Sequence, residues 1–278
     1  MNEVLQSGWL QTLPANSGNY ALPIASGNNY TGKDFGNFQR GIISGQKFND
    51  LNGNGAKDGG EAGLQNWKIK LTGAATESVM TDVSGNYSFA NLGPGSYTVS
   101  EETQSGWLQT VPLSPGTYSL NVISGSNFSG NNFGNFQYGT ISGTKFNDAN
   151  GNGVKDGGEA GIQNWKIRLS GVKTDSANTD VNGNYSFTQL NAGNYTVAED
   201  AQNGWLQTLP ASGGNYSLTI TSGSNFIAKD FGNFQLGSIS GQVYNDIDGD
   251  SVKDAGEPGL QNWKIRLSCA KTDSVFSD

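Results

Sequence analysis

Residues 148–159 read Asp148-Ala-Asn-Gly-Asn-Gly-Val-Lys-Asp-Gly-Gly-Glu159. Similar stretches begin at Asp50 and Asp246, so the three copies are 98 residues apart. The first two match D-x-[DN]-x-[DN]-G-x5-E, the pattern of a loop that binds calcium through oxygen ligands. The stretch therefore predicts both a tandem architecture and a site for a hard cation in each unit.

The 98-residue period extends well beyond this loop. Trp67, Trp165 and Trp263 each occur in Gln-Asn-Trp-Lys-Ile, and residues 40–137 and 138–235 align without a gap, with 64 identities in 98 positions. Such similarity is not chance, and the period has the size of a whole domain. We therefore expect folded repeats, each with its own core.

The period predicts four parts. Residues 40–137 and 138–235 are complete repeats, residues 1–39 match the C-terminal half of a repeat, and residues 236–278 match the N-terminal half. A half-repeat cannot bury a full core, so we expect both end segments to be less stable. The simplest interpretation is a fragment of a longer array.

Alternation of apolar and polar residues predicts an all-β fold. In the second repeat Trp165, Ile167 and Leu169 share one face of a strand, while Lys166 and Arg168 share the other. Seven or eight short strands separated by Gly, Asn and Ser turns indicate a β-sandwich. The expected strands lie at 139–147, 162–169, 185–187, 193–197, 205–209, 216–220 and 226–234.

The loop, between the first two expected strands, supplies oxygen ligands in a fixed order. Positions 1, 3, 5, 9 and 12 provide side-chain oxygens, position 7 a backbone carbonyl, and position 6 a sharp turn. The predicted Ca²⁺ ligands are Asp50, Asn52, Asn54, Ala56, Asp58 and Glu61; Asp148, Asn150, Asn152, Val154, Asp156 and Glu159; and Asp246, Asp248, Asp250, Val252, Asp254 and Glu257. The alternative is an Asn/Gly-rich turn that only starts a hairpin; three copies favour calcium.

The third copy differs at two kinds of position. Asp248 and Asp250 replace asparagines, which should raise cation affinity, whereas Ser251 replaces the turn glycine at an expected left-handed position, which should cost about 1 kcal/mol. In all copies the flanking segments are strands rather than the helices of an EF-hand. The cation is therefore expected to act as a staple and not as a helix-opening switch.

Composition excludes several classes of protein. The net charge of −8 argues against nucleic acid as a partner, because phosphate binding needs a basic surface. The chain has no histidine, which removes the commonest general base and the usual zinc ligands, so we do not expect an enzyme. Its single cysteine, Cys269, cannot form an intrachain disulfide.

The expected location is outside the cell. No apolar run approaches the roughly 20 residues that cross a bilayer. Weak calcium sites fill only where calcium is plentiful, which favours an extracellular protein, at a bacterial surface or secreted.

Four motifs resemble one family. They are Ile-Ser-Gly-x-Lys-Phe-Asn-Asp-x-Asn-Gly-Asn-Gly, Gly-x-Gln-Asn-Trp-Lys-Ile, Thr-Asp-Val-x-Gly-Asn-Tyr-Ser-Phe and Gly-x-Tyr-Thr-Val-x-Glu. Together they resemble the B repeats of serine-aspartate repeat adhesins and, more widely, the prealbumin-like B-type domains of collagen adhesins. The resemblance implies a tandem array of Ig-like, prealbumin-like sandwiches. It also implies a calcium-rigidified stalk whose partners are neighbouring repeats, with a separate head domain for a host protein or glycan.

The resemblance also implies a self-cross-linking alternative. Collagen-adhesin B-type domains can join a lysine to an Asn or Asp through an isopeptide bond, helped by a buried Glu. The matching residues are Lys47, Glu101 and Asn132 or Asn135, and Lys145, Glu199 and Asp230 or Asn233. An inward lysine is suggested by its counterpart Val243; the other interpretation is a lysine at a solvated edge or near the acidic loop.

A binding module is the third interpretation. The chain is rich in Asn, Gly, Tyr and Trp, which can line sugar-binding faces. Trp107 and Trp205 follow turns, so they can be exposed to a glycan or packed over the sandwich edge.

Overall fold

The computed structural model describes residues 1–15, 18–268 and 272–278; Cys269 lies outside these ranges. Contacts divide the chain into two compact units, Met1–Phe234 and Gln235–Asp278. This division lies within one residue of the expected repeat boundary at 235/236, while the four-part organisation as a whole stays a prediction. No helix in the described ranges is long and apolar enough to span a bilayer.

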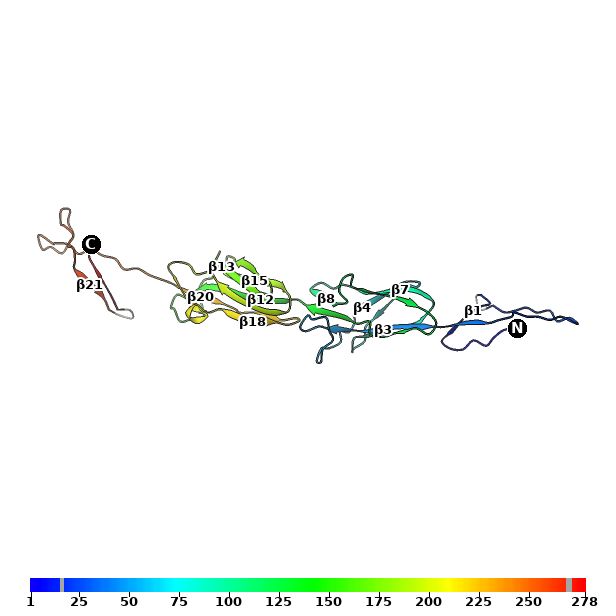
Figure 1. The fold of residues 1–278 in the computed structure, drawn as a ribbon. Helices are drawn as coiled ribbons and strands as arrows, with labels where there is room; N and C mark the ends of the chain where they lie inside the picture. The colour runs from blue at the N-terminus through cyan, green and yellow to red at the C-terminus, as the bar shows by residue number, and fades with distance from the viewer. Residues whose placement is uncertain (16–17, 269–271) are drawn as a thin grey trace. The chain divides into compact units, whose positions relative to one another are not determined.

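The first complete repeat is a two-layered β-sandwich (Figure 1). In one sheet β3 pairs with β6, β10 and β11, and β8 pairs with β11; the other sheet has the order β5-β4-β7-β9. The strands are β3 (Gly41–Asn49), β4 (Lys68–Gly73), β5 (Glu77–Met80), β6 (Asn86–Leu92), β7 (Gly95–Glu101), β8 (Trp107–Val111), β9 (Thr117–Val122), β10 (Asn127–Phe128) and β11 (Phe133–Gln137).

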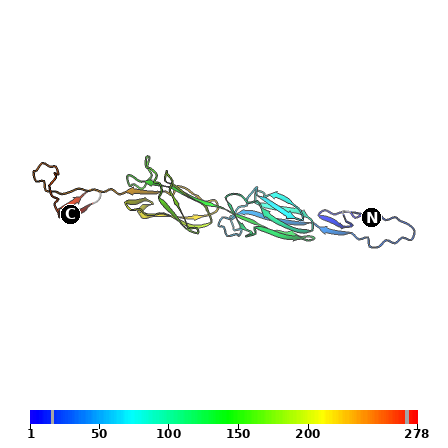
Figure 2. The same ribbon diagram turned by 90° about the horizontal axis from the view of Figure 1, so that it is seen from above.

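The second complete repeat has the same two sheets, seen from a second direction in Figure 2. In the first sheet β12 pairs with β15, β19 and β20, and β17 pairs with β20; the second has the order β14-β13-β16-β18. The elements are β12 (Gly139–Asn147), β13 (Lys166–Gly171), β14 (Asp175–Asn178), β15 (Asn184–Leu190), β16 (Gly193–Glu199), β17 (Trp205–Leu209), the 3-10 turn η1 (Ala211–Gly213), β18 (Tyr216–Ile220), β19 (Asn225–Phe226) and β20 (Phe231–Gln235).

The end segments contribute only short strand pairs. β1 (Trp9–Leu13) pairs with β2 (Gly36–Gln39), and β21 (Lys264–Leu267) pairs with β22 (Asp273–Phe276). The strands β21 and β22 are exposed at every position, whereas Trp165, Ile167 and Leu169 of the second repeat are at most 1% exposed. The all-β prediction is confirmed, as is the inward stripe of the second repeat.

The expected strand count of seven or eight is too low, because each complete repeat has nine. The expected strand 226–234 is two strands, β19 and β20, with Ala228 at φ 54° between them. The expected strand 162–169 begins only at Lys166, because Asn164 has φ 61°. Left-handed residues interrupt the extended backbone at both places, and alternation of side chains does not reveal them.

Ala228 provides a stability test with a matched partner. It holds a left-handed conformation that costs a residue with a Cβ roughly 1 kcal/mol, while its counterpart Gly130 has φ 76° and open space around it. Ala228→Gly is expected to stabilise the second repeat by about 1 kcal/mol, and Gly130→Ala to destabilise the first by a similar amount. Hydrogen exchange, measured separately for each repeat, gives both changes in the free energy of unfolding. If the two substitutions change the stability in the same direction, Ala228 is not strained by its backbone conformation.

Candidate metal loops and buried lysine sites

The first residue of each loop organises the turn around its carboxylate. Asp50 is fully buried at the end of β3, where its Oδ1 accepts from the Gly53 amide at 2.7 Å and its Oδ2 from the Gly55 amide at 2.7 Å. Asp148 is equally buried, and its Oδ2 accepts from the Gly153 amide at 2.7 Å. The glycines permit the positive φ that the tight turn requires.

The side chains of positions 3, 5 and 9 converge. The Nδ2 atoms of Asn52 and Asn54 donate to Asp58 Oδ2 at 2.9 and 2.8 Å. Asn150 and Asn152 approach Asp156 Oδ2 in the same way, both at 2.8 Å. The hydrogen bonds from Asn52 and Asn54 lower the pKa of the exposed Asp58 carboxyl. In each of these two loops the amide nitrogens of two asparagines thus meet one aspartate oxygen, while the asparagine Oδ1 atoms accept from backbone amides of the same loop.

Position 12 closes the loop on itself. Glu61 is 5% exposed, and its two oxygens accept from the amides of Leu51 at 2.8 Å and Asp58 at 3.0 Å. The two oxygens of Glu159 accept in the same way from the backbone amides of Ala149 and Asp156. At position 7 the amide of Ala56 donates to Asn54 Oδ1 at 2.7 Å, and Val154 does so to Asn152 at 2.7 Å. Val154 is 57% exposed, which suits a position where only the backbone would act as ligand.

The third loop concentrates negative charge. One carboxylate oxygen from each of Asp246, Asp248 and Asp250 lies within 4.8 Å of the others. Ser251 has φ 69°, which confirms the expected left-handed position. At the far end Glu257 accepts from the amides of Ile247 and Asp254, while the Val252 amide donates to Asp250.

This donor set fits a hard divalent cation. The loops offer carboxylate, amide and carbonyl oxygens without nitrogen or sulfur donors, which is the set that Ca²⁺ takes. In the third loop the converging carboxylates repel one another, and a cation between them would remove that cost.

Each complete repeat also buries one lysine beside one glutamate. Lys47 on β3 and Lys145 on β12 are fully buried, and their Nζ atoms lie 2.7 Å from Glu101 Oε2 and 2.9 Å from Glu199 Oε2. The expectation of a lysine at a solvated edge is therefore wrong, because the strand turns this side chain into the sandwich, as it does Ile43 and Ile141. A buried ammonium needs a partner, and the glutamate supplies it.

An asparagine completes each site. Asn135 Nδ2 donates to Glu101 Oε1 at 2.7 Å, and Asn233 Nδ2 to Glu199 Oε1 at 2.7 Å. The other two candidates lie elsewhere: Asn132 Oδ1 accepts from the Gln46 amide and Asp230 Oδ1 from the Thr144 amide. The structure thus brings together Lys47, Glu101 and Asn135, and Lys145, Glu199 and Asn233.

Burial tunes the protonation of these groups. Loss of solvation lowers the pKa of Lys47 and of Lys145 to about 8, against the opposing attraction of the glutamates. The same burial raises the pKa of Glu101 and Glu199. Both shifts favour the uncharged forms, an amine and a carboxylic acid.

Tryptophan forms one wall of each lysine site, which the sequence analysis missed. The Nζ atoms of Lys47 and Lys145 lie 4.3 and 4.4 Å from the ring centroids of Trp67 and Trp165. Sequence reasoning placed both tryptophans only in the core stripe. The spacing along the chain carries no signal for this contact, which depends on how the two sheets face each other.

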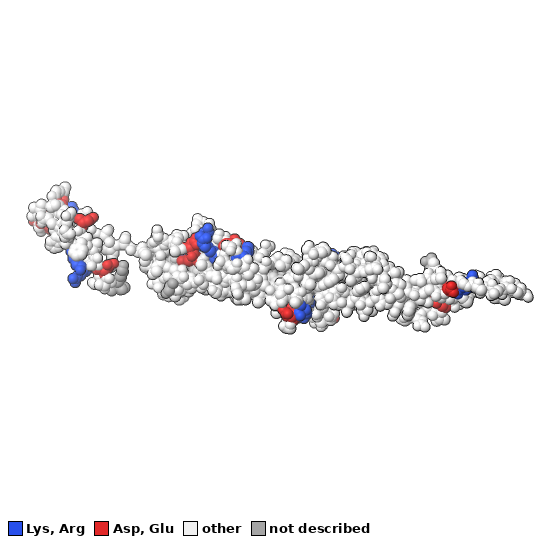
Figure 3. Space-filling view, viewed as in Figure 1, with Lys and Arg blue, Asp and Glu red and all other residues white. Residues whose placement is uncertain are grey.

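The two tryptophans considered for glycan binding pack against the core. Trp107 meets Trp67 edge-to-face at 5.4 Å, and Trp205 meets Trp165 at 5.6 Å. Trp107 and Trp205 are therefore packed against the sandwich and do not form an exposed surface for a glycan. Figure 3 shows that most of the visible surface is uncharged, with charged side chains in small clusters.

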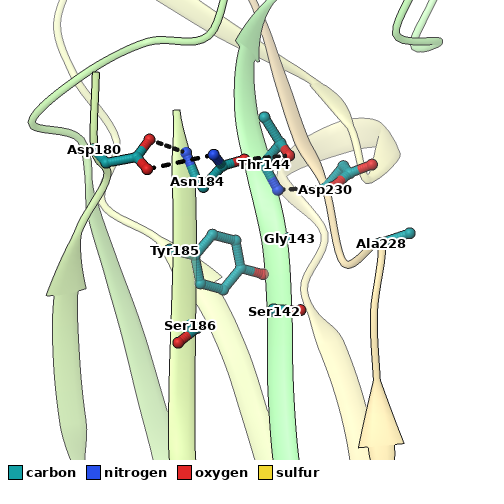
Figure 4. Close-up of a pocket in the computed structure, with 9 residues that line it drawn as sticks. All are labelled: Ser142, Gly143, Thr144, Asp180, Asn184, Tyr185, Ser186, Ala228 and Asp230. Atoms are coloured by element: carbon teal, nitrogen blue, oxygen red, sulfur yellow. Dashed lines mark hydrogen bonds between the residues drawn. The ribbon is translucent and has the colours of Figure 1, made fainter. Parts of the chain in front are cut away.

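A shallow polar hollow of about 550 Å³ lies on the second repeat (Figure 4). Its polar groups largely bond to one another: Asp180 accepts from Asn184, and Asn184 Oδ1 accepts from Thr144. Tyr185 is only 4% exposed, so the hollow presents no open aromatic face. It is lined by Ser142, Gly143, Thr144, Asp180, Asn184, Tyr185, Ser186, Ala228 and Asp230.

The profile of the SdrD B-like domain matches residues 43–117 and 139–229, more than half of the chain. The chain belongs to the SdrD B-like domain family. The two matched segments of this SdrD B-like chain lie in its two complete repeats. They include the lysine and the glutamate of each buried site and end before Asn135 and Asn233. The resemblance to B-type repeats is confirmed.

This SdrD B-like chain is similar in sequence to serine-aspartate repeat-containing proteins. It is 31% identical over 254 residues to serine-aspartate repeat-containing protein F of Staphylococcus epidermidis, covering 82% of this chain and 16% of that protein. It is 30% identical over 227 residues to protein E of Staphylococcus aureus, covering 70% and 20%. The chain thus spans a fifth or less of these relatives.

Solved structures similar to this chain include the Bacillus anthracis TIE protein, with TM-score 0.35, 17% identity and coverage of 85% of this chain and 40% of that one. The shaft pilin SpaA from Lactobacillus rhamnosus GG has TM-score 0.30, 11% identity and coverage of 72% and 100%. The family that the profile shows is a domain of repeat-containing proteins, in agreement with the expectation of a non-enzymatic chain.

Proposed function

We propose that this chain is a calcium-binding spacer segment of a bacterial surface adhesin, working outside the cell. The observation that carries the proposal is the convergence of Asp246, Asp248 and Asp250 in the third copy of a loop that occurs three times. Recognition of a host protein or glycan would be left to a head domain, and the repeats would contact one another.

Calcium is favoured over other cations for chemical reasons. Zinc prefers nitrogen and sulfur ligands, and the loops contain neither histidine nor cysteine. Magnesium usually keeps several waters and few protein ligands, whereas each loop offers six candidate protein ligands. Because strands flank the loops of the complete repeats, bound calcium would fix the connection between β3 and β4, and between β12 and β13.

Calorimetric titration tests the proposal directly. Calcium is expected to bind the full chain at three sites, one for each loop. Glu159→Gln should weaken one site, because it removes a charged ligand able to bind through both oxygens. Absence of binding heat at millimolar calcium, with displacement of a luminescent lanthanide also absent, would refute the proposal.

Self-cross-linking is a second candidate, favoured by the geometry of the lysine sites. Lys47 Nζ and Asn135 Nδ2 each donate a hydrogen bond to a different oxygen of the Glu101 carboxyl group. This group can therefore carry a proton from one nitrogen to the other. The uncharged Lys47 Nζ would attack Asn135 Cγ, Glu101 would take a proton from Nζ and give one to Nδ2, and ammonia would leave. The new bond joins Asn135 Cγ to Lys47 Nζ, and the bond that breaks is the one between Asn135 Cγ and Nδ2.

The mass of the intact, purified chain decides between cross-linked and free lysines. If both sites react, the mass is lower than the sequence mass by two ammonia molecules, one for each complete repeat. In Glu101→Gln the mass deficit should fall to one ammonia molecule, because glutamine cannot transfer the proton from Lys47 Nζ to Asn135 Nδ2. A wild-type mass equal to the sequence mass would exclude the bond and leave two buried ion pairs.

A further inference from the structure

Asparagine followed by glycine is concentrated in the loops. The chain has six Asn-Gly dipeptides, and four of them, at Asn52, Asn54, Asn150 and Asn152, occupy positions 3 and 5 of the first two loops. The other two, at Asn182 and Asn203, lie outside the loops. All four loop asparagines are exposed to water.

This dipeptide is chemically labile. The backbone nitrogen of the glycine attacks the asparagine Cγ, ammonia leaves, and a five-membered succinimide forms; water then opens the ring to aspartate or isoaspartate. The net change is amide plus water to carboxylic acid plus ammonia. Glycine makes the attack easy because it has no Cβ to hinder the approach and adopts the required backbone angles freely.

The folded loop restrains the attacking nitrogens. The amides of Gly53 and Gly55 both donate to the buried carboxylate of Asp50 at 2.7 Å, so the proton that each nitrogen must lose before it can attack is held in a hydrogen bond. In the second loop Gly153 donates to Asp148 Oδ2 at 2.7 Å, whereas the Gly151 amide donates to the Asp148 carbonyl at 3.3 Å and interacts less strongly than Gly153 with the Asp148 carboxylate. The asparagine amide groups are also held, by Asp58 and Asp156.

The third copy shows the loop with acids at these positions. Asp248 and Asp250 stand where the other copies have asparagines, and the turn keeps its shape, with Gly249 at φ 72° and Ser251 at φ 69°. Aspartate at both positions is therefore compatible with this loop. Conversion of Asn52 and Asn54 would give the first loop the same five carboxylates.

We infer that Asn52, Asn54, Asn150 and Asn152 are sites of deamidation, and that Asp50 and Asp148 protect them while the loop is folded. Loosening of a loop releases the glycine nitrogens and starts the conversion to acid. The protection follows from the hydrogen bonds alone; its dependence on calcium rests on the proposed function.

Peptide mapping by mass spectrometry tests the inference on the full chain after incubation at neutral pH. In Asp50→Ala, deamidation at Asn52 and Asn54 should accelerate several-fold over wild type, while Asn150, Asn152, Asn182 and Asn203 keep their wild-type rates. Among the loop residues of the wild type, Asn150 should convert first, because the Gly151 amide has the longest hydrogen bond. Circular dichroism of Asp50→Ala verifies that the sandwiches remain folded.

The outcomes separate this inference from the calcium proposal. Unchanged rates at Asn52 and Asn54 in Asp50→Ala would overturn the protection, whatever calcium does. Slower loop deamidation in excess calcium than in chelator supports both ideas. Rates that ignore calcium, together with acceleration in Asp50→Ala, would leave the protection standing and count against calcium binding.

Discussion

Chelation of calcium is expected to lower the midpoint of thermal unfolding of the full chain. A ligand that binds only the folded state at about 100 times its dissociation constant contributes about 2.7 kcal/mol per site. For a repeat of about 100 residues this corresponds to a shift on the order of 10 °C. Without the cation the carboxylates of each loop also repel one another. Differential scanning calorimetry in excess calcium and in excess chelator measures the shift.

A pair of glutamate variants locates this effect in the loops. Glu159→Gln is expected to remove part of the calcium-dependent shift, because Glu159 closes the second loop through both of its oxygens. Glu77→Gln changes an exposed glutamate of β5 outside the loops and should keep the full shift. Equal midpoints in calcium and chelator for the unmodified chain would show that the loops are turns without a stabilising cation.

Substitution of Lys145 by methionine is expected to destabilise the second repeat by roughly 3–5 kcal/mol. The variant leaves Glu199, whose side chain is 3% exposed, without its cationic partner inside the sandwich. Hydrogen exchange measured by mass spectrometry follows residues 139–235, and the first repeat in the same molecule serves as internal reference. A loss below about 1 kcal/mol would mean that Glu199 is already neutral or solvated in the folded chain.

A second substitution separates lost charge from lost packing. Lys145→Met with Glu199→Gln removes both charges and keeps an oxygen that can accept from Asn233 Nδ2. We expect this double variant to recover most of the stability, because replacing a buried ion pair by neutral groups of similar volume is often close to neutral. If the double variant is as unstable as Lys145→Met, the aliphatic packing of the lysine matters more than its charge.

Much of the fold was readable from the sequence because sandwich strands alternate with period two. The stripe of Trp165, Ile167 and Leu169 and the bounds of β12 at 139–147 follow from that pattern. The splitting of 226–234 was not readable, because Ala228 gives no local sign of its positive φ. Glycine at the matching position in the first repeat is the one hint that the sequence carries.

The lysine sites show where sequence reasoning stops. The choice between Asn132 and Asn135 depends on the register of β11 against β3, which aligns Phe133 with Lys47 and Asn135 with Asn49. That register joins segments more than 80 residues apart and is set by how the whole sheet packs. The candidate loop ligands, by contrast, are local in sequence, so spacing alone was enough to name them, and their binding of calcium stays a prediction.

The parallel pairing of β3 with β11 has a mechanical consequence. These are the first and last strands of the repeat, so a pull on its two ends drags them past each other along their length. The hydrogen bonds between them are then loaded in shear, all at once, rather than opened one after another as in a zipper. A covalent link from Lys47 to Asn135 would join the two strands within this sheared zone, and tension would cross the repeat without unravelling the residues between them.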